Sequence, residues 1–385
     1  MQIPLPGARR HSRDANRRGR KARARSRRGQ LSVDLDDVQG MTKLDSEDVL
    51  GATERFADQC REAWALGRAA RDLPDADGVE NVVVLGMGGS GISGDVVQAL
   101  VEPRLGVPWR TIKGYGPLPE WIGRNTLVFV VSYSGDTEET LAAFDEIHSR
   151  GARPVAVSSG GRLAELAGSY GVAQVKVPGG LQPRASLGFL ALPLLAVLAE
   201  IGMVPDCSDV VDEAVATLAD VAKTCSRDIP VEQNIAKQLA TSVSGRLPVI
   251  YGGSGLGEVA AYRFKCDLNE YAKIPAFANS LPEMNHNELE ALASADREDF
   301  VAVLLRDAED HERVALRFDV AKKLLERAGT EVIEVRSQGI SSLSRLLTLV
   351  LITQLAAIYG GLLNDVNPGP VPVIQDFKKH LADQQ

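Results

Sequence analysis

Residues 82–91 of the chain read Val82-Val-Val-Leu-Gly-Met-Gly-Gly-Ser-Gly91, an apolar run that ends in small residues. A second run of this kind is Val128-Phe-Val-Val-Ser-Tyr-Ser-Gly-Asp-Thr137. Each pattern predicts a buried strand, a tight loop and then a helix. Backbone N–H groups at a helix N-terminus bind anions, and parallel sheets bind ligands at the carboxyl ends of their strands. The two loops therefore predict a site for a phosphorylated small molecule.

Apolar runs of strand length alternate with helical patterns along the rest of the chain. In the first half we expect strands at 81–85, 109–114, 127–132, 154–158 and 173–177. In the second half we expect strands at 247–252, 300–305 and 331–335, and a buried helix at 342–360. Strands that alternate with helices are typical of an α/β protein with doubly wound parallel sheets.

An internal repeat divides the chain into two similar units. Ile250-Tyr-Gly-Gly-Ser-Gly255 repeats the strand, Gly-Gly-Ser-Gly and helix context of Leu85–Gly91. A recurring motif of this kind indicates a duplication with two domains in tandem. We place the first domain at residues 34–205 and the second at residues 206–385.

Residues 1–33 form a separate basic extension. Ten arginines and one lysine, against a single aspartate, lie within residues 1–30, whereas the whole chain has a formal net charge of −8. The extension lacks the apolar region of a secretory signal, and it has no aromatic residues among its arginines. We expect a disordered extension, or sequence upstream of a true start at Val33 or Met41, in preference to an arm that binds nucleic acid.

Composition narrows the class of protein further. The chain has 385 residues and is 44% hydrophobic, which is enough for two globular domains. The apolar stretch 187–201 contains Pro193 and Glu200 and is too short to span a bilayer, so no membrane partner is expected. The four cysteines form no Cys-x-x-Cys pair and the five histidines form no cluster, which favours a cytoplasmic protein with reduced thiols and no metal site.

The first loop also satisfies the dinucleotide pattern Gly86-x-Gly88-x-x-Gly91. A dinucleotide site needs an acidic residue at the end of the following strand, but that strand ends Ile112-Lys-Gly-Tyr-Gly116. We therefore rank a phosphate above a dinucleotide as the ligand. The second loop offers three hydroxyls for that phosphate, from Ser132, Ser134 and Thr137.

The pair of loops resembles a sugar isomerase (SIS) domain, and residues from about 34 to the C-terminus resemble the bifunctional phosphoglucose/phosphomannose isomerase family. The resemblance implies two tandem SIS-type domains and a phosphosugar substrate. It also implies that Gly89 and Ser90 line the sugar and that Ser132, Ser134 and Thr137 hold the phosphate. Arg184, in Gln182-Pro-Arg-Ala-Ser186, matches the active-site arginine of the family.

The same resemblance implies a catalytic pair. Glu270 and His286 match the glutamate and histidine of the family, as base and ring-opening catalyst, in Lys265-Cys-Asp-Leu-Asn-Glu270 and Glu283-Met-Asn-His286. In this family the histidine comes from the second subunit of a homodimer. Lys378 matches a C-terminal lysine that points at the substrate.

The expected reaction is the interconversion of glucose 6-phosphate and/or mannose 6-phosphate with fructose 6-phosphate through a cis-enediolate. A carboxylate suits the transfer of a proton between two neighbouring carbons, and a guanidinium stabilises the oxyanion that develops. This chemistry needs no cofactor. Two alternatives stay open, namely a non-catalytic regulator that binds phosphosugars and an isomerase of another phosphosugar. The preference between the two epimers is not settled by the sequence.

Overall fold

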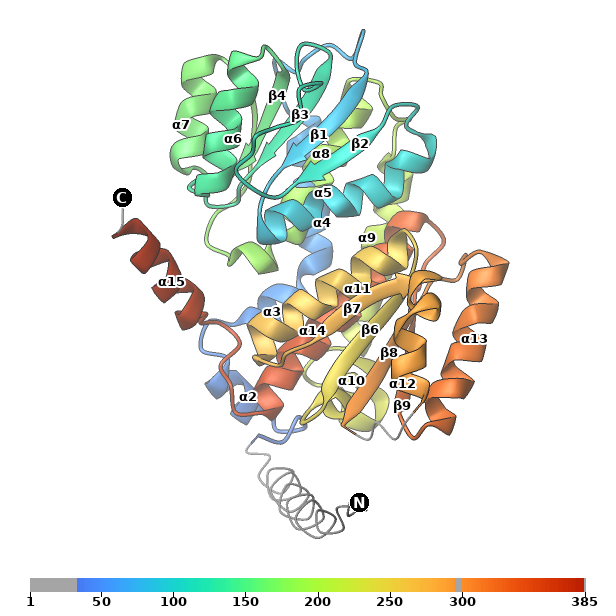
Figure 1. The fold of residues 1–385 in the computed structure, drawn as a ribbon. Coiled ribbons are helices and arrows are strands. Elements are labelled where there is room, and N and C mark those ends of the chain that lie inside the picture. Colours follow the sequence, from blue (N-terminus) through green and yellow to red (C-terminus); the bar gives the residue numbers. More distant parts are fainter. Residues whose placement is uncertain (1–32, 295–298, 384–385) are drawn as a thin grey trace, which may run out of the picture.

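The computed structural model describes residues 33–294 and 299–383, so the predicted basic extension lies outside the described residues except for Val33. The fold contains two parallel sheets (Figure 1). The first sheet has the strand order β2-β1-β3-β4-β5. Its strands are β1 (Asn81–Leu85), β2 (Trp109–Ile112), β3 (Thr126–Val131), β4 (Arg153–Ser158) and β5 (Ala173–Lys176).

The second sheet has the order β7-β6-β8-β9 and is also parallel. Its strands are β6 (Leu247–Gly253), β7 (Phe277–Leu281), β8 (Phe300–Arg306) and β9 (Glu331–Arg336). The order matches that of the first four strands of the first sheet, which confirms the α/β class with two tandem sheets. Strand β7 was not expected, because Phe277-Ala-Asn-Ser-Leu281 has two polar residues near its centre and its first three residues are only partly buried or exposed.

Alternate residues of each strand point to opposite faces of the sheet and so pack against two different layers of helices. Val82 and Val84 of β1 face the helices between the sheets, whereas Val83 and Leu85 face the outer helices. The outer helices of the first sheet are α6 (Glu138–Ser149) and α7 (Gly161–Tyr170), and those of the second are α12 (Glu288–Ala293) and α13 (Glu312–Arg327). Both sheets are therefore covered on both faces, as parallel sheets require.

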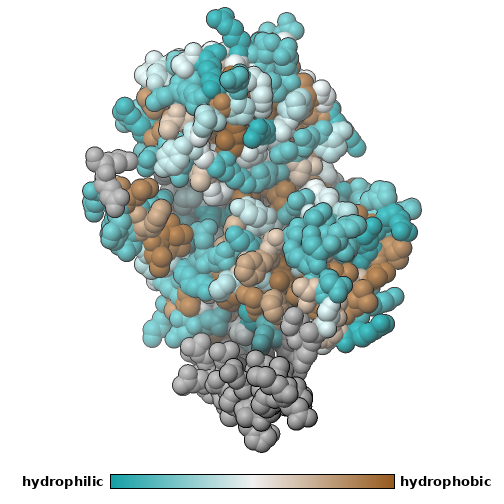
Figure 2. Space-filling model, in the orientation of Figure 1, coloured by the Kyte–Doolittle hydropathy of each residue, from teal (hydrophilic) through white to brown (hydrophobic). Residues whose placement is uncertain are grey.

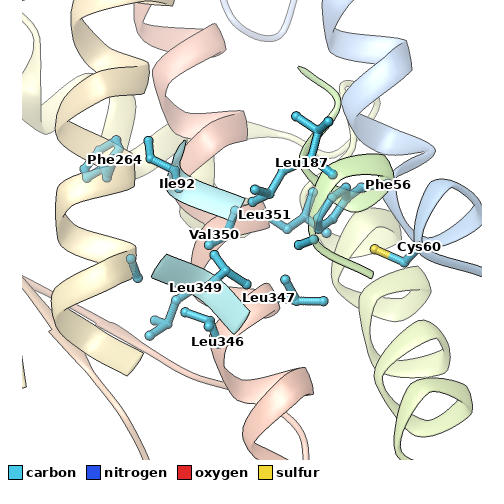
Figure 3. Close-up of a cluster of buried hydrophobic side chains, with 14 of the residues drawn as sticks. Phe56, Cys60, Ile92, Leu187, Phe264, Leu346, Leu347, Leu349, Val350 and Leu351 are labelled. Atoms are coloured by element: carbon cyan, nitrogen blue, oxygen red, sulfur yellow. The ribbon is translucent and has the colours of Figure 1, made fainter. Parts of the chain in front are cut away.

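The helices between the sheets form one continuous apolar core. They are α4 (Phe56–Arg68), α5 (Gly88–Val101), α8 (Leu187–Glu200), α9 (Ser208–Thr224), α10 (Ile235–Val243), α11 (Leu256–Asp267) and α14 (Ser342–Leu363). Figure 3 shows Phe56, Ile92 and Leu187 from the first unit beside Phe264 and Leu349 from the second. The two units consequently share their hydrophobic core.

Helix α14 is the long apolar element at the centre of this core. Among the described residues it is the one helix long and apolar enough to cross a membrane, and its apolar window is entirely buried inside the protein. The buried helix predicted at 342–360 is confirmed, and it extends to Leu363. A helix that is apolar on all sides is typical of a protein core as well as of a membrane span.

The segment before α4 packs against the second unit. It contains α2 (Val38–Leu44) and α3 (Val49–Glu54). The buried ammonium of Lys237 donates a hydrogen bond to the carbonyl of Leu35 at 2.6 Å, and Arg227 pairs with Glu54 at 3.1 Å. The predicted domain boundary between residues 205 and 206 stays a prediction.

The last helix, α15 (Pro372–Ala382), lies apart from the two sheets (Figure 1). None of its residues is buried, and Val373 and Phe377 are 80% and 66% exposed. Figure 2 shows this apolar surface of α15 in brown. The helix follows a proline-rich turn, residues 367–371, that contacts the candidate site.

Candidate active site

The loop after β3 holds its hydroxyls away from the helix cap. Ser132 is fully buried, and its Oγ lies 2.9 Å from Oγ1 of Thr137. Thr137 is the N-cap residue of α6, yet its side chain makes no capping hydrogen bond. Ser134 is exposed at the surface of the loop and accepts a hydrogen bond from the N–H of Asp136 at 3.2 Å. The hydroxyls of this loop thus bond to one another and to the backbone of the loop, and the Thr137 side chain does not cap α6.

Gly135 is required by the shape of this loop. Its φ of 81° lies in the left-handed region, and a Cβ at this position would lie 1.9 Å from the carbonyl oxygen of Gly160. Its N–H donates to Ser132 Oγ at 3.1 Å. The absence of a side chain lets the loop after β3 pack directly on the loop after β4.

The loop after β1 joins this arrangement through Ser90. The hydroxyl of Ser90 is buried and accepts a hydrogen bond from the N–H of Tyr133 at 3.3 Å. Gly89 lies in the first turn of α5, and a Cβ there would lie 2.9 Å from the carbonyl of Pro183. The structure therefore brings together the loops after β1 and β3 and the turn that carries Arg184.

Arg184 belongs to the short 3-10 helix η2 (Pro183–Ala185) and is only 6% exposed. Its guanidinium donates to the carbonyls of Pro368, at 3.1 Å, and of Gly369. The guanidinium carbon lies 4.9 Å from the ring centre of Tyr271. Its Nε is buried and has no partner among the described residues. The described residues therefore leave one buried N–H of this arginine without an acceptor.

Glu270 is the anionic partner of Arg184. A carboxylate oxygen of Glu270 lies 3.6 Å from a guanidinium nitrogen of Arg184, and the side chain is about one third exposed. Glu270 sits in a π-helical turn, η4 (Leu268–Ala272), that follows α11. Such turns are frequent at functional sites, because the extra residue redirects a side chain out of the regular helix.

A buried ion pair on α11 supports both Arg184 and Glu270. The Nε of Arg263 donates to the Asp267 carboxylate at 2.9 Å, and both side chains are almost fully buried. Another nitrogen of Arg263 donates to the backbone carbonyl of Arg184. Helix α11 therefore fixes the turn of Arg184 as well as the turn of Glu270.

Two polar residues beside the pair of Arg184 and Glu270 were not predicted from the sequence. Gln59 of α4 donates to the carbonyl of Ala185 at 2.9 Å and accepts from the N–H of Gly188 at 2.7 Å, which fixes the turn of Arg184 from both sides. Lys273 donates to the carbonyls of Glu270 and Pro370. Gln59 appears in the sequence as a polar residue on the apolar face of a helix. No local pattern marks Lys273.

Within one chain, the fold does not bring His286 or Lys378 to the pair of Arg184 and Glu270. His286 ends the 3-10 helix η5 (Glu283–His286) after β7, whereas Glu270 precedes β7, so the strand separates the two residues. His286 is exposed. Lys378 is exposed on α15. The catalytic roles of both residues stay predictions.

The second Gly-Gly-Ser-Gly motif lies at a different kind of site. Ser254 and Gly255 line a cavity of about 380 Å³ together with Asp307 and Asp310. Burial raises the pKa of Asp310 to about 6. Arg104 and His311 also line this cavity, whereas its carboxylates disfavour a phosphate.

No three side chains of the types His, Cys, Asp and Glu gather in a possible metal-binding group within residues 33–294 and 299–383. The described cysteines Cys60, Cys207, Cys225 and Cys266 are free thiols. The expectation of an enzyme without a metal or cofactor stays a prediction.

Two parallel sheets of matching order, with a hydroxyl-lined loop at the carboxyl edge of the first, define a protein of the SIS-domain class. The family model for the "Bacterial phospho-glucose isomerase C-terminal SIS domain" matches residues 232–381. A hypothetical protein from Thermus thermophilus has a similar structure, with a TM-score of 0.69, 18% identity and coverage of 97% of this chain and 96% of that one.

Proteins of known name give a finer assignment. The chain is 35% identical to a bifunctional phosphoglucose/phosphomannose isomerase from Caldicellulosiruptor bescii over 85% of this chain and 96% of the relative. It is 36% identical to the protein of the same name from Aquifex aeolicus, over 81% of this chain and 92% of the relative. The chain belongs to the bifunctional phosphoglucose/phosphomannose isomerase family.

Proposed function

We propose that the chain is an aldose–ketose isomerase that interconverts glucose 6-phosphate and/or mannose 6-phosphate with fructose 6-phosphate through a cis-enediolate. Membership of the family supports the reaction. The observation that carries the assignment is the ion pair of 3.6 Å between Glu270 and the buried Arg184, beside the loops after β1 and β3. A regulator that only binds phosphosugars is not favoured, because the relatives of this chain are named as isomerases.

In this proposal Glu270 moves a proton between C1 and C2 of the open-chain sugar. A positioned carboxylate of this kind contributes about 100- to 10,000-fold to the rate. Arg184 stabilises the charge on the enediolate oxygens with its guanidinium, of which one nitrogen lies 3.6 Å from the Glu270 carboxylate. Ser132, Ser134 and Thr137 hold the phosphate, and Gly89 and Ser90 line the sugar.

We further propose that the active site is shared between the subunits of a homodimer. His286 is exposed and separated from Glu270 by the length of β7, which supports its delivery to the site of a second chain. An imidazole that titrates near neutrality suits the opening of the sugar ring. The free cysteines support a cytoplasmic location, and we propose no nucleic-acid or membrane partner.

The test is to supply glucose 6-phosphate and mannose 6-phosphate separately, in the presence of EDTA, and to follow fructose 6-phosphate with a coupled assay. We expect turnover of at least one epimer that EDTA does not reduce. Phosphosugar binding without turnover of either epimer would contradict the proposed function and would leave the regulator or another phosphosugar as the alternative. Loss of turnover in EDTA would contradict only the proposal of metal-free chemistry.

A further inference from the structure

The loop that carries His286 is anchored on both sides of the histidine. Met284 is fully buried in the apolar cluster that covers the outer face of the second sheet. The side chain of Asn287 donates to Glu283 at 2.9 Å and accepts a hydrogen bond from the N–H of Glu288 at 2.6 Å. The backbone of this loop is therefore held immediately before and after residue 286.

The carboxylate of Glu288 receives hydrogen bonds from two different strands. The hydroxyl of Tyr251, on β6, donates to one oxygen at 2.6 Å. The amide of Asn279, on β7, donates to the other oxygen at 2.6 Å. Hydrogen bonds to an ionised carboxylate are among the stronger ones in proteins. The carboxylate is therefore attached to the two strands that support the loop.

Tyr251 is suited to act as a permanent donor. Its side chain is fully buried on the outer face of β6. Burial raises the pKa of this phenol far above its usual value, and the hydrogen bond to Glu288 raises it further. The hydroxyl thus stays protonated near neutral pH.

The side chain of His286 itself is not held in this way. Among the described residues, no hydrogen bond or ion pair involves its imidazole, and the residue is exposed. Two neighbouring residues, Met284 and Glu288, are tied to the second sheet instead. The attachment therefore acts on the backbone position of His286 and leaves the ring free to meet a group outside this chain.

We propose that Tyr251, Asn279 and Glu288 are positioning residues, which hold the loop 283–288 so that His286 enters the active site in the correct place. The proposal rests on the proposed function, in which His286 opens the sugar ring. A displacement of a catalytic group by about 1 Å costs about 100-fold in rate. A residue that acts only through His286 affects kcat and leaves the affinity for the phosphosugar unchanged.

The test is a double-mutant cycle with Tyr251→Phe and His286→Ala. We expect Tyr251→Phe alone to lower kcat by about 10- to 100-fold at unchanged KM. In the His286→Ala background, the same substitution should lower kcat by less than about 2-fold, because the group that it positions is already absent. A merely structural tyrosine would lower kcat by the same factor in both backgrounds.

Tyr359→Phe is the matched control. Tyr359 is also fully buried, and its hydroxyl donates to the carbonyl of Cys225 at 2.8 Å, in the core between the sheets. Its loss should lower the melting temperature with little effect on kcat. If Tyr251→Phe does not fold, Asn279→Ala replaces it in the cycle, because Asn279 is only partly buried and its loss removes the second hydrogen bond to Glu288.

The outcomes separate this proposal from the function on which it rests. Equal effects of Tyr251→Phe in both backgrounds, or a wild-type kcat for the folded Tyr251→Phe variant, would overturn the positioning role while leaving the isomerase assignment intact. A wild-type kcat for His286→Ala would instead show that the histidine is not catalytic, and the positioning role would fall with it.

Discussion

At the scale of single residues, the site depends on a carboxylate and a guanidinium that contact each other across the two units. Arg184 comes from the turn before α8, and Glu270 comes from the π-helical turn after α11. Arg184 is buried, whereas Glu270 is partly exposed and can reach a ligand. Their environments fit different roles, with Arg184 fixed in place and Glu270 available for proton transfer.

The first prediction concerns the base. Glu270→Gln should lower kcat by about 100- to 10,000-fold and leave phosphosugar binding intact, because the amide keeps the shape and loses the proton acceptor. Coupled assays and calorimetric titration measure the two quantities. Glu258→Gln is the control, since Glu258 is an exposed glutamate on the same stretch of chain, in α11. Near-normal turnover of Glu270→Gln would show that another group is the base.

The second prediction concerns the phosphate. Ser134→Asp should raise KM by about 10-fold or more, because a carboxylate within a few ångströms repels the dianion. Ser149→Asp adds the same charge at the far end of α6, where the serine donates to the carbonyl of Glu146, and should leave KM unchanged. If KM responds equally to both substitutions, the phosphate binds elsewhere.

At the scale of elements, the contact between α9 and the start of α14 fixes the central helix. The Glu213 carboxylate on α9 accepts hydrogen bonds from the N–H of Ile340, at 2.9 Å, and from Ser341. Ser341 is the N-cap residue of α14. A carboxylate at this end also interacts favourably with the dipole of the helix.

The third prediction follows from the pKa of Glu213. Burial raises this pKa, but the hydrogen bonds from Ile340 and Ser341 outweigh burial and lower it from 4.5 to about 2. The folded state thus prefers the charged form, so the stabilisation is present above pH 4.5 and is lost as the pH falls toward 2. Glu213→Gln should cost about 1 kcal/mol near neutral pH, since solvent screens part of the interaction.

Urea unfolding at several pH values measures this effect. The difference in the free energy of unfolding between wild type and Glu213→Gln should shrink as the pH falls below 4.5. Asp212→Asn is the control, because Asp212 is the exposed neighbour on α9. A difference that stays constant with pH would mean that the charge of Glu213 does not contribute.

At the scale of the whole molecule, the helices between the sheets make the two units a single core (Figures 1 and 3). The candidate site lies where the units meet, since Arg184 belongs to the first unit and Glu270 to the second. The proline-rich turn 367–371 is a third segment of the site, since the carbonyls of Pro368 and Gly369 accept hydrogen bonds from Arg184. His286 is at the other end of β7 from this site.

The fourth prediction tests whether His286 acts in a second chain. Glu270→Gln and His286→Ala, each nearly inactive alone, should recover up to about a quarter of wild-type activity when they are co-expressed, because mixed dimers would contain one intact site. Native mass spectrometry establishes that mixed dimers are present. Mixed dimers without recovered activity would place the histidine in the site of its own chain.

Local sequence patterns determined the strands, the tight loops and the duplication. Strand and helix periods, and the glycines that a loop such as 132–137 requires, act between neighbours along the chain and can therefore be predicted from sequence. Strand β7 was missed because two polar residues interrupt its apolar pattern. The buried helix at 342–360 was predicted from its continuous apolar run, and the structure has it as α14, which ends at Leu363.

Only the tertiary structure decided how the site is assembled. The contact of Arg184 with Glu270, the support of Arg184 by Gln59, and the attachment of the turn at Gly369 all join residues far apart in sequence. Such contacts form when packing brings distant segments together, and no local period encodes them. The residue types indicated the chemistry, and the shared core of the two units determined which of these residues contact each other.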